Sequence, residues 1–267
     1  MLSTPPVLLS IAGYDPSSGA GVTADVKTAA AHGCYAITCI TAVTVQTTQG
    51  VRKVQPLDPE MVSQTLFELA ADIPIHAVRI GMLGSSAVAG EVARFLEPVR
   101  PSIVVLDPVI RSSSGTGLLD ERGEAVIRDR LLRLATVVTP NAEEAAALTG
   151  TEVRSIEQAR VAARKLQEMD ARSVVITGGH LPENTDVLLW RDLEGVVHEA
   201  LIPGERINSE ATHGTGCAFA SALACNLANG EIMPDAVRNA KQYVRQAIQN
   251  AYPLGRGKGP MNHLFRT

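Results

Sequence analysis

The regular alternation of short apolar runs with helix-like segments constrains the fold of this chain more than any other feature. Apolar runs of strand length alternate with segments of helical spacing, and Gly, Pro and Asp stand at their boundaries. This order is typical of right-handed βαβ units and predicts a mostly parallel sheet with helices on both faces. No linker, repeat or low-complexity stretch interrupts it, so we expect residues 1–267 to form one α/β domain.

The expected elements follow from this periodicity. Strands are expected at 7–11, 36–41, 77–80, 103–107, 137–139 and 173–177, with an edge strand at 51–55 and a hairpin at 186–191 and 196–201. Helices are expected at 22–32, 58–71, 86–96, 121–134, 141–149, 155–169, 216–229 and 234–251. Ligands bind beyond the carboxyl ends of such strands. The site is therefore predicted in loops 12–21, 44–50, 81–85, 107–117, 140–144, 178–185 and 203–217.

Composition excludes several classes of function. The formal net charge is −4 and aromatic residues make up 3%, which argues against a nucleic-acid-binding surface. No apolar run approaches the ~18–20 residues that span a bilayer, and the N-terminus MLSTPPVLLS lacks the basic region of a signal peptide. The four cysteines form no CxxC pair, so no zinc site is expected. We expect a cytoplasmic protein with neither nucleic acid nor membrane as a partner.

The strongest single signal is the segment THGTGC at 212–217, which precedes a long apolar helix. Its glycines let backbone N–H groups converge, and a helix N-terminus adds a partial positive charge, so the segment can cradle phosphate oxygens. A tight turn without a ligand is the alternative. Because the helix terminus favours a thiolate, Cys217 is a candidate base or nucleophile. A second glycine-rich loop, 12–25, lacks the lysine of a Walker A loop.

Several polar residues in the predicted loops are further candidates. Asp107 ends a strand and could serve a metal, act as a base or cap a helix. Asn141 and Glu144 share one face of a first helical turn, where they could hold Mg²⁺ through water or form a solvated helix start. His213 could touch phosphate, and Gln46 could bind an amide or a ring nitrogen; either could also be an ordinary loop residue.

Taken together, these segments resemble one family over residues 7–265. The matching segments are AGYDPSSGAGVTADVKTAAAHG, TAVTVQTTQGV, IGMLGS, VVLDPVI, VTPNAEEAAALTG, GGHL, HGTGCAFASALACNLANG and GRGKGPMNH, in this order. They resemble the hydroxymethylpyrimidine/phosphomethylpyrimidine kinases of the ribokinase-like superfamily. The resemblance implies a three-layer α/β/α sandwich without a large lid, usually dimeric. It also implies that ATP, with Mg²⁺, phosphorylates 4-amino-5-hydroxymethyl-2-methylpyrimidine and then its monophosphate, for thiamine synthesis.

The resemblance also assigns residues by motif. It places the pyrimidine against Gly13, Asp25, Gln46, Met82 and Val109. It places the transferring phosphate on Gly214, Thr215 and Gly216, with Cys217 at the position where sugar kinases of the superfamily carry a catalytic Asp. Nucleotide and metal are expected at Asp107, Arg111, Asn141, Glu144, Thr177 and His213, with Glu144 and Asp107 as the metal ligands.

Two segments depart from the family pattern, and both departures remove a lysine. Where many members carry Ala-Lys-Ser-Gly after DPV, this chain reads RSSSG at 111–115, and where many carry Lys before Gly-Gly-His it has Thr177. Arg111 is predicted to replace one of these cations. Two other functions fit the same residues: a pyridoxal or pyridoxine kinase, and a non-catalytic pyrimidine-binding protein, against which the intact HGTGC segment argues.

Overall fold

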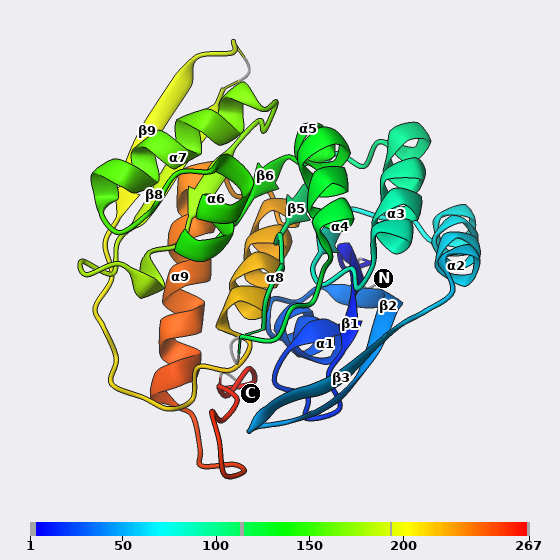
Figure 1. The fold of residues 1–267 in the computed structure, drawn as a ribbon, viewed down its shortest axis with the longest axis horizontal. Coiled ribbons are helices and arrows are strands. Elements are labelled where there is room, and N and C mark those ends of the chain that lie inside the picture. Colours follow the sequence, from blue (N-terminus) through cyan, green and yellow to red (C-terminus); the bar gives the residue numbers. More distant parts are fainter. Residues whose placement is uncertain (1–3, 113–114, 193, 266–267) are drawn as a thin grey trace.

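The computed structural model of the protein describes residues 4–112, 115–192 and 194–265. These residues form one nine-stranded sheet in the order β3-β2-β1-β4-β5-β6-β7-β8-β9, with helices on both faces (Figure 1). Neighbouring strands from β2 to β7 in this order are parallel. At the two edges the pairing is antiparallel: β3 with β2, β8 with β7, and β9 with β8. The predicted α/β/α sandwich with a mostly parallel sheet is confirmed.

The element bounds agree closely with the predicted ones. The strands are β1 Val7–Tyr14, β2 Tyr35–Thr47, β3 Gly50–Pro56, β4 Ala77–Ile80, β5 Val104–Leu106, β6 Val137–Val138, β7 Val174–Ile176, β8 Asp186–Arg191 and β9 Val197–Ile202. The α-helices are α1 Gly21–Ala31, α2 Pro59–Asp72, α3 Ser86–Val99, α4 Glu121–Val126, α5 Leu132–Leu134, α6 Ala142–Thr149, α7 Ile156–Glu168, α8 Thr215–Ala228 and α9 Met233–Gln249. A π-helical turn, Ile127–Leu131, joins α4 to α5, and Gly178–His180 is a short 3₁₀ turn.

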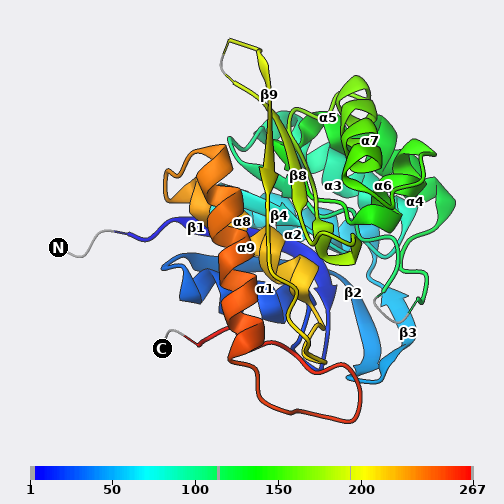
Figure 2. The same ribbon diagram turned by 90° about the vertical axis from the view of Figure 1, so that its left-hand side faces the viewer.

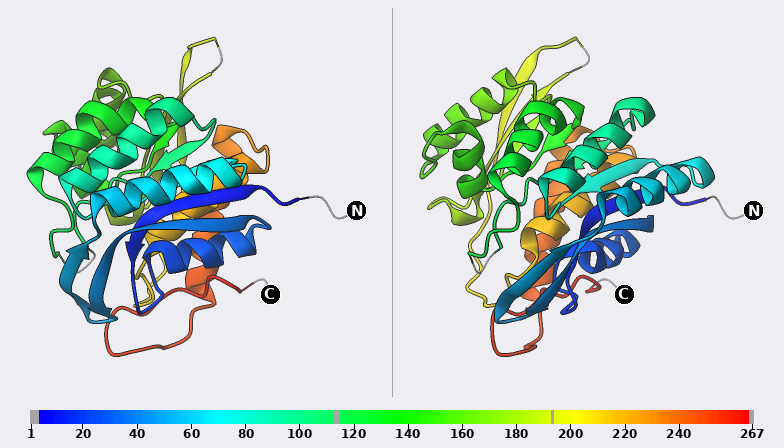
Figure 3. Two further views of the ribbon diagram at one scale, coloured as in Figure 1. Left: turned by 90° about the vertical axis from the view of Figure 1, so that its right-hand side faces the viewer. Right: turned by 45° about the vertical axis from the view of Figure 1, so that its right-hand side comes forward.

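Each face of the sheet has its own apolar core. Successive strand residues point to opposite faces, so Leu9 and Ile11 pack with α2, α3, α6 and α7, whereas Leu8 packs with α1, α8 and α9. Figures 2 and 3 show these two helical layers on either side of the sheet. The central strands β1, β4, β5, β6 and β7 are buried on both faces, which explains why they are short, mostly apolar runs in the sequence.

The largest departure from the predicted elements is the length of β2. The apolar run predicted a strand that ends near Thr41, but β2 continues to Thr47 and pairs with β3 from Ala42 to Thr47. In the continuation, exposed Val43 and Val45 alternate with half-buried Thr44 and Gln46, so its apolar residues do not form a buried run. We call residues 42–56 the β-flap, because this antiparallel hairpin extends along one side of the site.

Candidate functional site

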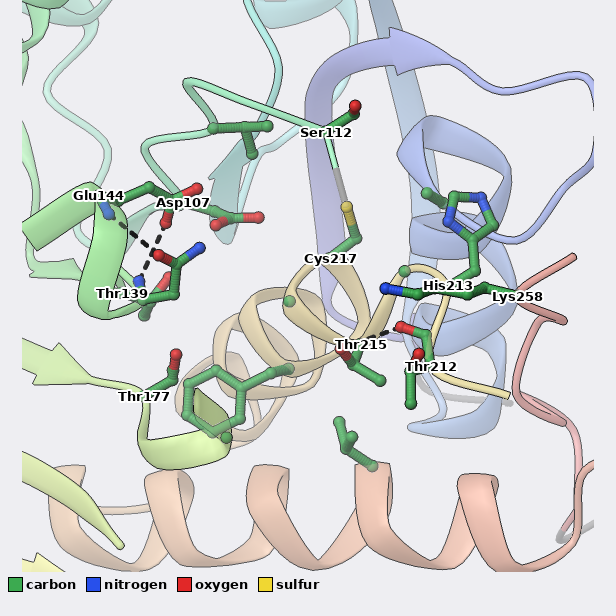
Figure 4. A pocket seen from close by; sticks show the side chains of 18 of the residues that line it. Asp107, Ser112, Thr139, Glu144, Thr177, Thr212, His213, Thr215, Cys217 and Lys258 are labelled. Atoms are coloured by element: carbon green, nitrogen blue, oxygen red, sulfur yellow. Dashed lines mark hydrogen bonds between the residues drawn. The ribbon is translucent and has the colours of Figure 1, made fainter. Parts of the chain in front are cut away.

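A cavity of about 990 Å³ opens at the carboxyl edge of the sheet (Figure 4). Its wall includes residues from every loop in which the sequence predicted the site, and also from the β-flap and α9. Of the predicted pyrimidine contacts, Gly13, Gln46, Met82 and Val109 lie on this wall. The other predicted residues found on it are Asp107, Arg111, Asn141, Glu144, Thr177, His213, Gly214, Thr215, Gly216 and Cys217.

The segment at 212–217, which we call the glycine loop, forms the cavity floor at the start of α8. Gly214 is the residue before the helix and has a φ of 79°, a left-handed conformation that glycine adopts without strain. A Cβ at this position would lie 1.8 Å from the Gly19 carbonyl oxygen. The helix begins without a side-chain cap. Its first N–H groups therefore remain available to an anion in the cavity.

Cys217 lies in the first turn of α8 and is partly exposed to the cavity. Burial raises the pKa of its thiol to about 11, and the nearby Asp107 and Asp25 act in the same direction, whereas Arg79 lowers it. The expectation that the helix terminus favours a thiolate is wrong for the free protein. Desolvation and two acidic neighbours outweigh the dipole and the one cation, so the neutral thiol is the form present at pH 7.

Arg79 of β4 is completely buried at the back of the cavity, between two carboxylates. Its guanidinium donates to Asp25 at 3.0 Å and to Asp107 at 2.6 Å. Asp25 also accepts hydrogen bonds from Ser10 at 2.6 Å and Ser221 at 2.7 Å. The Asp25 carboxylate thus has only protein partners and does not line the cavity, so its predicted contact with the pyrimidine has no support in this geometry.

Arg79 was missed in the sequence, although the signal was there: an arginine inside the apolar strand AVRI. Its neighbour Gly81 makes room for it, because a Cβ there would lie 2.0 Å from Arg79 Nη1. Burial raises the pKa of Asp107 to about 6; Arg79 opposes this shift and Asp25 adds to it. Asp107 therefore titrates close to neutral pH, within reach of a ligand in the cavity.

Asn141 and Glu144 form a reciprocal capping box at the start of α6. The Asn141 side chain accepts from the Glu144 N–H, and the Glu144 carboxylate accepts from the Asn141 N–H, both at 3.0 Å. Glu144 is only 7% exposed, so the alternative of a solvated helix start is wrong. Burial first, and then the nearby Asp107, raise the pKa of Glu144 well above its usual range.

Asp107 and Glu144 together suit a hard divalent cation. Figure 4 shows the two side chains next to each other on one wall of the cavity. Two buried carboxylates that repel each other are stabilised by a cation, and Mg²⁺ binds one or two carboxylates while keeping waters and phosphate oxygens. Among the described residues, no three His, Cys, Asp or Glu side chains gather as a metal cluster. The two carboxylates of Asp107 and Glu144 fit the small number of carboxylate ligands that Mg²⁺ takes.

We expect Glu144→Gln to stabilise the ligand-free protein at pH 7.5 while weakening Mg²⁺-ATP binding about tenfold. Glutamine preserves the capping box and removes a carboxylate whose folded-state pKa is raised. At pH values below the pKa of Glu144 in the unfolded chain, such a group has no effect on stability. Stability falls as the pH rises from there through the folded-state pKa. The melting temperature should therefore exceed that of the wild type at pH 7.5, by about 2–4 °C per kcal/mol, and match it near pH 4. A melting temperature below that of the wild type at pH 7.5 would contradict the raised pKa of Glu144.

On the opposite wall, His213 joins the first loop to the β-flap. Its Nε2 lies 2.7 Å from Asp15 Oδ2 and 3.1 Å from Gln46 Nε2, and Thr44 Oγ1 donates to Gln46 Oε1 at 3.1 Å. Although burial raises the pKa of Asp15, hydrogen bonds from His213 and Ser17 bring it below its usual range. His213 was expected beside the nucleotide, but its ring contacts Asp15 and Gln46, of which Gln46 is one of the residues predicted to surround the pyrimidine.

The family pattern described as phosphomethylpyrimidine kinase matches residues 15–262. The chain belongs to this family. Among its curated relatives, the hydroxymethylpyrimidine/phosphomethylpyrimidine kinase of Aquifex aeolicus is 37% identical over 251 residues, covering 94% of this chain and 97% of that protein. The thiamine biosynthesis bifunctional protein of Geobacter sulfurreducens is 41% identical over 258 residues, and this chain spans 52% of its length.

Solved structures of related kinases share the fold of this phosphomethylpyrimidine kinase family member. The phosphomethylpyrimidine kinase of Clostridium difficile superposes with a TM-score of 0.79 at 32% identity, over 91% of this chain and 99% of that one. An ADP complex of Bacillus subtilis pyridoxal kinase superposes with a TM-score of 0.87 at 31% identity, over 97% and 98%. The family and the ribokinase-like fold without a large lid are thus confirmed.

None of the helices within the described part of the chain combines the length and apolar character needed to cross a bilayer.

Proposed function

We propose that this protein transfers the γ-phosphoryl group of ATP to the hydroxymethyl group of 4-amino-5-hydroxymethyl-2-methylpyrimidine, and then phosphorylates the resulting monophosphate. The observation that carries the proposal is that one cavity has a site suited to phosphate at one end and a site suited to a heterocycle at the other. The uncapped start of α8 at Gly214 offers N–H groups to phosphate, and Gln46, positioned by His213, offers an amide to a heterocycle on the opposite wall. Membership of the phosphomethylpyrimidine kinase family supports the same reaction.

In the first step the hydroxyl oxygen of the substrate attacks the γ-phosphorus, the bond to the β-phosphate oxygen breaks, and ADP leaves. The hydroxyl proton passes to a base, for which Cys217 and Asp107 are the candidates on the cavity wall. In the second step a phosphate oxygen of the monophosphate attacks instead, giving the diphosphate. Asp107 and Glu144 would hold Mg²⁺, which when bound offsets the charge of the nucleotide phosphates. The N–H groups of the glycine loop stabilise the transferring group.

Pyridoxal phosphorylation is the second candidate, because the ADP complex of a pyridoxal kinase superposes well on this chain. Both substrates present a hydroxymethyl group on a nitrogen heterocycle. The deciding experiment measures ATP-dependent phosphorylation of the pyrimidine alcohol, its monophosphate, pyridoxal and pyridoxine side by side. We expect the highest kcat/KM with the pyrimidine substrates. Turnover of pyridoxal alone would make the protein a pyridoxal kinase, and binding without turnover of any alcohol would make it a non-catalytic binding protein.

Gln46 is expected to select the heterocycle. Substituting Gln46→Leu removes the amide and leaves polar ring atoms of the pyrimidine unpaired in the site, a mismatch that sites built on hydrogen bonds reject strongly. We expect KM for the pyrimidine alcohol to rise at least ~10-fold, while KM for ATP changes less than ~2-fold. Steady-state kinetics with each substrate varied in turn measures both constants. An equal rise in both would remove Gln46 from pyrimidine recognition.

The assembly and location of the protein are further proposals. The family resemblance supports a homodimer acting in the cytoplasm, with ATP and the pyrimidine as its small-molecule partners. Light scattering on the purified protein measures the oligomeric state directly, and a monomeric mass at micromolar concentration would contradict the dimer. Arg111 and Thr177 lie on the cavity wall, and the predicted contact of each with nucleotide phosphates stays a prediction.

A further inference from the structure

The end of the chain returns to the cavity and contacts the glycine loop. We call residues 255–260, with the sequence GRGKGP, the C-terminal strap. The His213 N–H donates to the Gly259 carbonyl at 3.1 Å, and His213 forms an isolated parallel bridge with Pro260. Gly259 and Pro260 are buried. The strap is therefore fixed at the residue that precedes Gly214, where the phosphate cradle begins.

The other end of the strap is fixed to the tip of the β-flap. The Arg256 and Gly257 N–H groups both donate to Thr48 Oγ1 at 3.2 Å. A Cβ on Gly257 would lie 2.1 Å from the Thr48 carbonyl oxygen, so the two backbones approach as closely as they do only because a glycine stands there. The strap thus links the wall that carries Gln46 to the floor that carries the glycine loop.

Lys258 lies between these two attachments, and its side chain is on the cavity wall. Figure 4 shows it pointing into the cavity, toward the start of α8. Most other cations on this wall already have partners. Arg79 is paired with Asp25 and Asp107, Lys241 with Asp186, Arg238 with Asp235 and Arg245 with Glu205, while Arg206 donates to the Leu181 carbonyl. Among the lysines and arginines described on this wall, only Arg111 and Lys258 have neither an ion pair nor a hydrogen bond to protein.

We propose that Lys258 donates to the phosphoryl group held by the glycine loop, which makes this one side chain of the C-terminal strap part of the active site. The inference rests on the proposed function, in which donor and acceptor phosphates gather negative charge above Gly214 and Thr215. The N–H groups of the cradle are neutral dipoles, so a free ammonium group adds a charge that they lack. The second phosphorylation brings a further phosphate and should depend on Lys258 more strongly than the first.

The test compares Lys258→Met and Lys258→Arg with Arg256→Ala as a matched control. Arg256 is exposed on the same strap, and its side chain is not on the cavity wall. We expect Lys258→Met to lower kcat/KM for the monophosphate about 10- to 100-fold, the size of a lost charge-assisted hydrogen bond, and that for the pyrimidine alcohol by less. Lys258→Arg should restore most of the rate, and Arg256→Ala should stay within about 2-fold of the wild type.

A second measurement does not depend on turnover. Calorimetric binding of inorganic pyrophosphate with Mg²⁺ should weaken about 10-fold or more in Lys258→Met and remain unchanged in Arg256→Ala. Lys258 is exposed, so equal melting temperatures are expected and confirm folding. If the wild type shows no turnover, the proposed function is contradicted. The role of Lys258 is then tested by the pyrophosphate affinity alone. Unchanged rates and binding in Lys258→Met, or equal losses in Arg256→Ala, overturn the inference.

Discussion

Replacing Cys217 by alanine is expected to lower kcat about 10²- to 10⁴-fold, the usual cost of losing a positioned base. The thiol lies in the first turn of α8, directly after the residues that form the phosphate cradle. Because burial raises the pKa of Cys217 to about 11, only a small fraction is thiolate at pH 7, and this fraction grows about tenfold with each pH unit. Wild-type kcat should therefore rise steadily between pH 7 and 10, whereas that of the alanine variant should not.

A second variant separates a base from a merely structural thiol. Cys217→Asp places a carboxylate where the sequence resemblance puts the catalytic Asp of sugar kinases. An aspartate ionises far below pH 11 even when burial raises its pKa, so we expect this variant to be active with a flat rate from pH 8 to 10. Near-normal turnover of Cys217→Ala, with an unchanged melting temperature, would contradict the base role.

The strands of the sheet could be predicted because a buried strand has an apolar sequence of its own, which can be recognised without knowing its neighbours. A parallel strand covered on both faces is apolar at nearly every position, as Val104 to Leu106 are. The second half of β2 could not be found in this way. There only one face is covered, and the strand exists because β3 pairs with it, an arrangement that the apolar run ending near Thr41 does not encode.

The glycine loop could be predicted, but the environment of its cysteine could not. A helix start after Gly214 is a local property, and so is its partial charge. The pKa of Cys217 depends instead on residues brought from other elements: Asp25 of α1, Arg79 of β4 and Asp107, which follows β5. Local reasoning therefore placed the thiol correctly in the cavity and gave its pKa shift the wrong sign.

Long-range pairs explain the remaining misses. Asp15 was noted only as part of a loop, because its partner His213 lies 198 positions away in the chain. The same holds for Asp25, which the family resemblance placed at the substrate. Its partner Arg79 is 54 positions away, and the two meet only because β1, which leads into α1, pairs with β4. Motif matching finds which residues matter in such a site, but not which of them touch the ligand.

The buried arginine gives the largest expected effect on stability. Arg79→Met should lower the free energy of unfolding by about 3–5 kcal/mol, the cost of breaking a buried ion pair from one side. The guanidinium is fully buried between Asp25 and Asp107. Without it two carboxylates face each other with no cation, and Asp25 keeps only its hydrogen bonds from Ser10 and Ser221. Urea unfolding at pH 7.5 measures the change.

Two further variants show whether the charge of Arg79 or its volume is responsible. Arg154→Met is the matched control, because its ion pair with Glu152 is mostly exposed and such pairs contribute at most about 1 kcal/mol. In the double variant Asp25→Asn with Arg79→Met, one of the stranded charges is removed. The asparagine oxygen can accept from one of Ser10 and Ser221, while its amide N–H donates to the hydroxyl of the other. We expect this second substitution to recover part of the stability that Arg79→Met loses, a coupling of about 1–3 kcal/mol. If the losses of stability from the two substitutions were strictly additive, Arg79 would stabilise the protein by filling space. Its position between two carboxylates would then not explain why the buried strand β4 contains a charged residue.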